Sequence, residues 1–166
     1  MVDVVDELDN ILYRASLRDC KARGLLHRAV AVFLLNSSGE ILLQQRSLSD
    51  DWLPGRWTIS TTGHVRAGEN PSDASVRELK EELGIAGVPT LLFKQLVPKI
   101  ESLGQIEREL TYVYEVRSDL EPKINPIEVA KVRFESVGES RRLISSNKGD
   151  FTPDSILILE KYLQLE

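Results

Sequence analysis

This chain of 166 residues has a single cysteine, no long apolar run and no excess of positive charge. Its one cysteine, Cys20, excludes an intramolecular disulfide, so we expect a reducing, cytoplasmic setting in which Cys20 is an inert small hydrophobe. No stretch approaches the roughly 20 apolar residues that span a bilayer, and the acidic first residues predict neither a secretory signal nor a membrane anchor. The net charge of -5 argues against a nucleic-acid polymer as partner, because phosphate backbones require a basic surface.

The length and composition that are present fit a single domain over residues 1–166. Apolar residues make up 42% and charged residues 28% of the chain, which is ordinary for a globular protein. The negative net charge leaves room for a small phosphate-bearing ligand, because a bound cation reverses the local sign of the charge. Either a monomer or a homodimer is compatible with these features.

Hydrophobic patterning predicts an α+β fold of the α/β/α sandwich type, with a central mixed sheet between helices. The apolar run at 28–35 predicts a central strand that is buried on both faces. The first 25 residues predict a hairpin and a short helix that ends at Gly24. The other predicted strands are 40–45, 57–60, 90–97, 107–116 and 128–134, and the late helices are 140–146 and 153–165.

One further helix carries the chemistry, and its ends are marked. Asn70 caps it, Pro71 occupies its first position, and Gly84 follows its last residue, Leu83. One side of this helix is an apolar stripe that can pack on the sheet. The stripe consists of Val76, Leu79 and Leu83.

The same helix brings three carboxylates together. At about 100° per residue, Glu78, Glu81 and Glu82 fall within roughly a 100° arc. Like charges this close repel, and a hard divalent cation with a preference for oxygen ligands, such as magnesium, removes the repulsion and bridges to substrate phosphates. A solvated face is the alternative interpretation, with Arg77 paired to Glu81 one turn on.

The longer segment favours the metal site. Residues 63–85 resemble a complete Nudix box, with every fixed identity at its spacing: Gly63, Glu69, Arg77, Glu78, Glu81, Glu82 and Gly84. The resemblance implies one Nudix domain and a hydrolase that cleaves a diphosphate linkage in a nucleoside di- or triphosphate or a related small organic diphosphate. It also implies Mg²⁺, with Mn²⁺ as a substitute. The implied ligands are Glu78, Glu81, Glu82 and the Gly63 carbonyl, with Arg77 and Glu69 bracing the loop.

Other roles stay open at this point. The general base that takes a proton from the attacking water is Glu81 or Glu78 or, as in family members that use a glutamate outside the box, Glu109. His64 directly follows the metal-loop glycine and is a candidate substrate contact. Arginine and lysine suit a diphosphate, so Arg46, Arg56 and Lys99 are further candidates, with solvated surface charge as the alternative for each.

A rival reaction comes from a wider resemblance. Residues 26 to 135 are similar to type I isopentenyl-diphosphate isomerase, in Leu26-His27-Arg28, Leu42-Leu43-Gln44-Gln45-Arg46, Pro54-Gly55-Arg56-Trp57, Gly63-His64 and Glu107-Arg108-Glu109. That enzyme has a cysteine immediately before the Gly-His step, where this chain has Thr62, and an upstream histidine ligand where this chain offers Cys20. A hydroxyl is a far poorer proton donor than a thiol at neutral pH. Both departures favour hydrolysis, as does the intact box, which also argues against a non-catalytic binding module.

Overall fold

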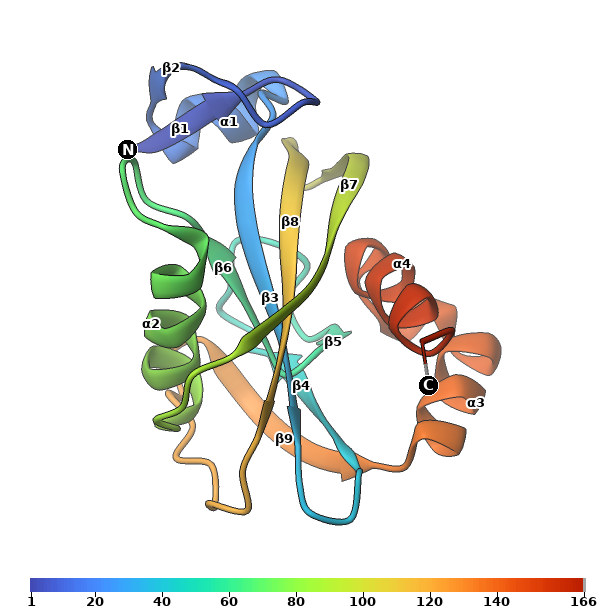
Figure 1. Ribbon diagram of the computed structural model, residues 1–166. Coiled ribbons are helices and arrows are strands. Elements are labelled where there is room, and N and C mark those ends of the chain that lie inside the picture. The colour runs from blue at the N-terminus through green and yellow to red at the C-terminus, as the bar shows by residue number, and fades with distance from the viewer. Residues whose placement is uncertain (166) are drawn as a thin grey trace.

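A computed structural model describes residues 1–165 as three layers, with a nine-stranded mixed sheet between helices (Figure 1). Helix α2 (Pro71–Leu83) covers one face of the sheet, and α3 (Val137–Ser146) and α4 (Pro153–Tyr162) cover the other. A hairpin and the short helix α1 (Leu17–Arg23) lie across one end. The predicted α/β/α sandwich is therefore confirmed. The strands are β1 (Val2–Val5), β2 (Ile11–Ala15), β3 (His27–Leu35), β4 (Ile41–Arg46), β5 (Trp57–Thr58), β6 (Thr61–His64), β7 (Thr90–Ser102), β8 (Gln105–Arg117) and β9 (Val129–Glu135).

Strand β3 organises the sheet. It pairs in parallel with β8 along its whole length and antiparallel with β6. It meets β4 only at the pair Leu35–Ile41, so no ladder joins these two strands toward the His27 end of β3. The sheet is therefore open between β3 and β4 toward the His27 end of β3, and both of these strands border a cavity there.

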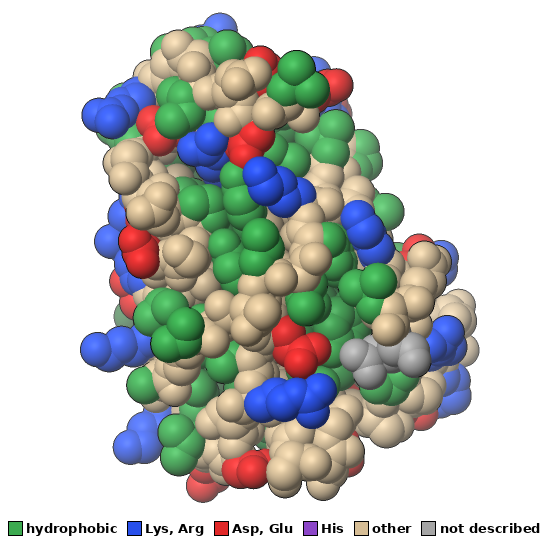
Figure 2. All heavy atoms as spheres, in the orientation of Figure 1, with side chains coloured by type: hydrophobic (Ala, Val, Ile, Leu, Met, Phe, Trp, Pro, Cys, Tyr) green, Lys and Arg blue, Asp and Glu red, His purple; other side chains and the backbone are tan. Residues whose placement is uncertain are grey.

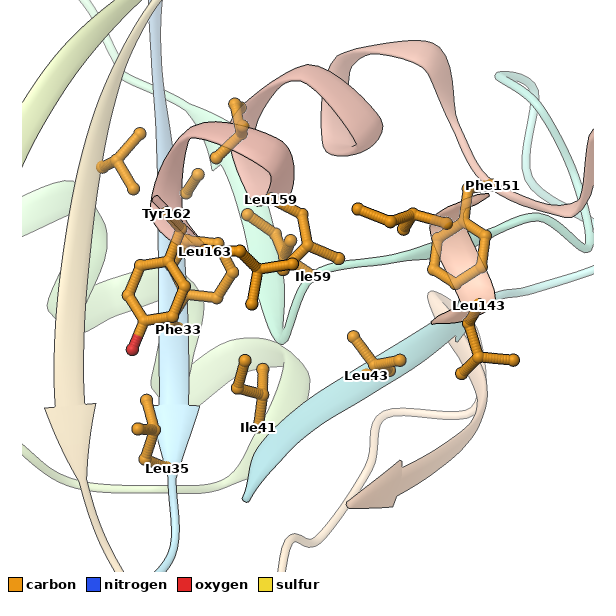
Figure 3. Packing of buried hydrophobic residues seen from close by; sticks show 14 of the residues in the cluster. Phe33, Leu35, Ile41, Leu43, Ile59, Leu143, Phe151, Leu159, Tyr162 and Leu163 are labelled. Atoms are coloured by element: carbon orange, nitrogen blue, oxygen red, sulfur yellow. The ribbon is translucent and has the colours of Figure 1, made fainter. Parts of the chain in front are cut away.

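The two faces of β3 supply two hydrophobic cores, as the continuous apolar run predicts. On one face Phe33 stacks on Tyr162 of α4, with ring centroids 4.0 Å apart (Figure 3). On the other face Val32 and Leu34 pack with Leu79 and Leu83 of α2. Because β3 is held from both sides, the residues at its start have a fixed position.

Helix α2 begins and ends where the sequence predicts, with one difference on its packing face. Gly84 adopts the left-handed conformation that ends the helix, at φ 65°. Val76, predicted to belong to the apolar stripe, is 37% exposed, because this turn of the helix buries Ala74 and Ser75 instead. The stripe prediction was therefore wrong at Val76 and correct at Leu79 and Leu83.

Several element ends differ from the prediction for local reasons. Strand β7 continues past Val97 to Ser102, because an irregularity between Val97 and Ile100 absorbs Pro98, which cannot donate to the ladder. Ser136 caps α3 by accepting a hydrogen bond from the Glu139 amide, so that helix starts earlier than predicted. The predicted 57–60 strand is shortened to β5, and β6 was not predicted as a strand. The C-terminal helix ends at Tyr162, short of 165, and a 3₁₀ turn at Lys148–Asp150 was not predicted.

The surface carries charges of both signs. In the view of Figure 2, Lys and Arg side chains lie interspersed with Asp and Glu, and no face of a single charge is visible. Within residues 1–165, the helices are too short or too polar for any of them to cross a bilayer.

Candidate active site

A cavity of about 670 Å³ lies at the open end of the sheet. Its wall includes Thr62, Gly63 and His64 from β6, which is the strand that leads into the loop before α2. Two groups of ligand-type side chains come together here from different elements, and all of them except His27 line the cavity. We call Glu78, Glu81 and Glu82 the box glutamates, and we call His27, His64, Glu107 and Glu109 the strand cluster.

Arg77 holds the loop and the helix together. Its Nε and Nη2 donate to the two carboxylate oxygens of Glu69 at 2.8 and 2.9 Å, and Nη2 also donates to the His64 carbonyl at 3.0 Å. Its Nη1 lies 2.5 Å from Glu78 and 3.2 Å from Glu81. The planar guanidinium thus binds four groups at once, which is the bracing geometry expected of Arg77 and Glu69.

The box glutamates differ in burial. Glu78 and Glu82 are 7% and 5% exposed, whereas the Glu81 side chain is 45% exposed at the rim. Glu82 accepts a hydrogen bond from the Thr61 hydroxyl. Burial raises the pKa of Glu78, and burial also raises the pKa of Glu82, to about 8. A bound cation would stabilise the ionised form of two such buried carboxyl groups.

Gly63 fits this site because it has no side chain. A Cβ atom at this position would collide with the carboxyl group of Glu78. Gly63 pairs with Val30 of β3, so its backbone lies directly against the glutamate helix. The glycine of the box therefore permits the close approach between β6 and Glu78.

The strand cluster is a consequence of register. His27 is opposite Glu109 in the parallel ladder, and His64 is opposite Ala29, two residues after His27. Because side chains two apart on a strand share a face, His27, His64, Glu107 and Glu109 must all project to one side. Their ligand atoms lie within 4.8 Å of one another.

Unsatisfied atoms in this cluster indicate a missing charge. Within residues 1–165, His27 Nε2, His64 Nε2 and Glu107 Oε2 are buried without a hydrogen-bond partner. His27 Nδ1 donates to the Leu25 carbonyl at 2.9 Å, which leaves the lone pair of Nε2 directed at the cluster. Two imidazole nitrogens and two carboxylates fit a divalent cation, because their convergence otherwise leaves buried polar atoms unpaired.

The electrostatics of the cluster agree with this interpretation. Burial lowers the pKa of His27 and keeps the ring neutral, as a ligand requires. Burial opposes a charge on His64, but Glu107 and Glu109 outweigh it and raise the His64 pKa to about 9. Burial likewise opposes a charge on Glu107, yet His64 and Lys21 hold its pKa at about 2, and Lys21 Nζ lies 3.0 Å from Glu107 Oε1. Without a cation, His64 and Lys21 supply the positive charge between the carboxylates.

The cation candidates for substrate binding separate into two groups. Arg46 reaches the cavity, but its guanidinium already donates to the Trp52 carbonyl at 2.8 Å and to Asp50 at 2.7 Å. Of the described residues, those that line the cavity do not include Arg56 or Lys99. Arg56 borders a separate polar pocket. Lys99 is exposed at the β7 irregularity, between Val97 and Ile100, which both border the cavity. The structure thus places Arg56 and Lys99 outside the lining of this cavity, and a substrate contact by either stays a prediction.

Three contributors to the site had no predicted role. His27 and Glu107 were named only within the stretches similar to the isomerase, and Lys21 was not named. The signal for Glu107 was available, because Glu107 and Glu109 alternate on a strand and so share a face. Nothing in the local sequence of α1 indicates that Lys21 reaches β8.

Two departures from the isomerase pattern also lie here. Thr62 borders the cavity beside Gly63. Cys20 is fully buried, and burial raises the pKa of its thiol, so the sulfur stays protonated. Cys20 does not line the cavity, so none of the described residues places a thiol there.

Comparison with known proteins identifies the family of this chain. A family model of the NUDIX domain matches residues 25–155. The chain therefore belongs to the Nudix family.

Its relatives include enzymes with two different names. The protein named isopentenyl-diphosphate Delta-isomerase 1 from Photorhabdus laumondii subsp. laumondii is 36% identical over 156 residues, which are 92% of this chain and 88% of that protein. A protein named uncharacterized Nudix hydrolase from Yersinia pestis is 42% identical over 88 residues, covering 53% of this chain and 48% of the relative. The chain is thus similar to both kinds of Nudix protein.

A solved structure shares the fold. The protein DR0079 from Deinococcus radiodurans superposes with a TM-score of 0.74 at 24% identity, covering 96% of this chain and 97% of that one. At this identity the likeness supports the three-layer architecture alone.

Proposed function

We propose that this protein is a Mg²⁺-dependent hydrolase that cleaves the diphosphate linkage of a nucleoside di- or triphosphate or a related small organic diphosphate, with Mn²⁺ as a substitute. The observation that carries the proposal is the composition of the cavity. All three box glutamates border it, together with His64, Glu107 and Glu109 of the strand cluster, and the residue before Gly63 is a threonine. The wall thus offers two sets of cation ligands and no thiol among its described residues.

Each set has a role in this proposal. Glu78, Glu82 and the Gly63 carbonyl hold magnesium, and Glu81 completes the set from the rim. Bound cations supply charge neutralisation of the diphosphate and a lower pKa for the attacking water. Water oxygen attacks one phosphorus atom, the bond from that phosphorus to the bridging oxygen breaks, and the second phosphate departs with that oxygen.

A carboxylate accepts the proton that the water loses. Glu81 is bound to Arg77 and Arg66, and Glu78 is bound to Arg77, so arginines already engage both carboxylates. Glu109 is free of arginine contacts within residues 1–165 and lies 3.3 Å from His64, inside the cavity. We therefore assign Glu109 as the general base, in preference to Glu81 or Glu78.

Isomerisation of isopentenyl diphosphate is the second candidate. The strand cluster favours it, together with the 36% identity to a protein of that name. Thr62 weighs against it, because proton transfer at carbon needs a stronger acid than a hydroxyl.

One experiment separates the two reactions. Purified protein and Mg²⁺ are incubated with nucleoside di- and triphosphates, nucleotide sugars and isopentenyl diphosphate, and phosphorus NMR and chromatography follow phosphate release and prenyl isomers. Phosphate or nucleoside monophosphate from at least one substrate is the expected result. An isomerised prenyl product without phosphate release would establish the isomerase instead, and turnover of nothing would leave a binding module.

A further inference from the structure

Asp154 is a charged side chain of the cavity that the chemistry above does not use. It is the second residue of α4, after Pro153, and it borders the cavity together with Ile158 one turn later. It is not a member of the strand cluster. Its position marks the α4 side of the cavity.

The Oδ1 atom of Asp154 is buried and has no hydrogen-bond partner within residues 1–165. The hydroxyls nearby are committed to each other, because Thr152 Oγ1 donates to Ser155 Oγ at 2.7 Å and Ser155 Oγ donates to the Thr152 carbonyl. The guanidinium of Arg46 is committed to Asp50 and Trp52. A buried acceptor left in this state is costly unless a ligand completes it.

Apolar side chains also line this cavity. Val97 and Ile100 of β7 and Ile158 of α4 border the same cavity. Burial, followed by the charge of Glu109, raises the pKa of Asp154 to about 6. An ionised carboxylate accepts hydrogen bonds and donates none.

We propose that Asp154 accepts a hydrogen bond from the organic group of the substrate, and so selects an organic diphosphate that carries N–H or O–H donors over one with a hydrocarbon tail. This inference rests on the proposed function for the location of the diphosphate at the box glutamates. An anionic phosphate would be repelled by Asp154, so the carboxylate faces the other half of the ligand. A hydrocarbon group would fill the apolar wall but leave Oδ1 desolvated and unpaired, which sites of this kind reject strongly.

The test measures binding, so that it does not depend on turnover. Calorimetry with saturating Mg²⁺ compares α,β-methylene-ADP and α,β-methylene-CDP, which carry amino and hydroxyl donors, with the methylene-bridged analogue of isopentenyl diphosphate. Methylenediphosphonate, which has no organic group, is the reference. The wild-type protein is expected to bind at least one nucleoside analogue about tenfold or more tightly than the prenyl analogue.

Asp154→Leu is expected to weaken binding of that nucleoside analogue about tenfold or more. It should leave binding of methylenediphosphonate unchanged and strengthen binding of the prenyl analogue. Asp154→Asn keeps an acceptor oxygen and the size of the side chain, so it should lose less, and it provides the test if the leucine variant does not fold. Asp150→Leu, which removes an exposed carboxylate that does not border this cavity, is the matched control and should bind like wild type.

Three results would overturn the inference. The first is a wild-type protein that prefers the prenyl analogue or shows no preference, and the second is a set of Asp154 variants that keep the wild-type preference. The third is a loss of affinity for methylenediphosphonate as large as the loss of affinity for the nucleoside analogue. Failure of the proposed function looks different. In that case the donor preference and its dependence on Asp154 are found, but no substrate of the same class is hydrolysed.

Discussion

The box glutamates stand on one turn and a half of helix α2, whereas the strand cluster collects its four residues from three strands that are distant in sequence. The box carboxylates have partners already, from Arg77 and Thr61. The strand cluster leaves two imidazole nitrogens and a carboxylate oxygen without hydrogen-bond partners among the described residues. One set offers oxygen only and the other mixes nitrogen with oxygen, so the two sets should differ in the cation they prefer and in how their loss affects the protein.

The largest effect is expected from the box. Glu82→Gln removes a ligand charge while keeping the shape of the side chain, so the fold should be retained. Loss of a group outside the first ligands already costs 10–100-fold, so turnover should fall by more than about 100-fold. Initial rates with a hydrolysed substrate measure this, and Glu121→Gln at an exposed position is the control. Unchanged turnover in Glu82→Gln would remove the box from the chemistry.

The second effect distinguishes the strand cluster from the box. His64→Asn takes one nitrogen ligand away, so affinity for Mn²⁺ or Zn²⁺ should drop by about 10–100-fold or more. Metal titration on apo protein measures this affinity. Glu82→Gln should keep the transition-metal affinity that His64→Asn loses. Equal losses in the two variants would mean that the sets form a single site.

The third effect concerns the brace between loop and helix. Arg77→Lys preserves the charge but cannot bind Glu69, Glu78 and the His64 carbonyl at the same time. The rate should therefore fall by about 10–100-fold with little change in stability. Steady-state kinetics and thermal melts measure both quantities, with Arg117→Lys on the exposed end of β8 as the control. A rate equal to wild type would show that charge alone is sufficient.

The smallest effect is on stability, at the end of the sheet that bears the strand cluster. Asp9 of the hairpin binds Arg28, Lys94 and Tyr112. Burial opposes its charge, but Lys94, Tyr112 and Arg28 outweigh burial and hold the pKa of Asp9 below its usual value. The stability from this contact is therefore present above the ordinary pKa near 3.8 and is lost as the pH falls through the lowered value.

Asp9→Asn suits this test because asparagine tolerates the left-handed backbone at this position, φ 71°. The substitution should lower the free energy of unfolding by about 1–3 kcal/mol at neutral pH and flatten the acid side of the stability profile. Urea denaturation at several pH values measures both. A variant with the same acid slope as wild type would show that other carboxyl groups set it.

The contrast between the two sets also explains how much the sequence could predict. The box is one continuous segment of the chain, so its spacing alone was sufficient to predict the helix and its cap glycine. The central strand β3 followed from its apolar run, and the α/β/α layers from the order of elements. These features follow from the kinds of residue along continuous stretches of the chain.

The strand cluster could not be predicted in the same way. Its assembly depends on the register His27–Glu109 and Ala29–His64, and a shift by one residue would turn side chains to the opposite face. Hence no role was predicted for Glu107 or Lys21, and the exposure of Lys99 at the β7 irregularity was not foreseen. Periodicity reports which residues share a face of one strand but not which strands become neighbours.

Attack of water on a diphosphate in this cavity is the central proposal. The direct measurement is incubation with Mg²⁺ and the substrate panel in water enriched in oxygen-18, followed by mass spectrometry of the products. We predict one labelled oxygen in a phosphate product of the wild-type protein and none with Glu82→Gln. An isopentenyl product with a moved double bond and no label in phosphate would contradict the account.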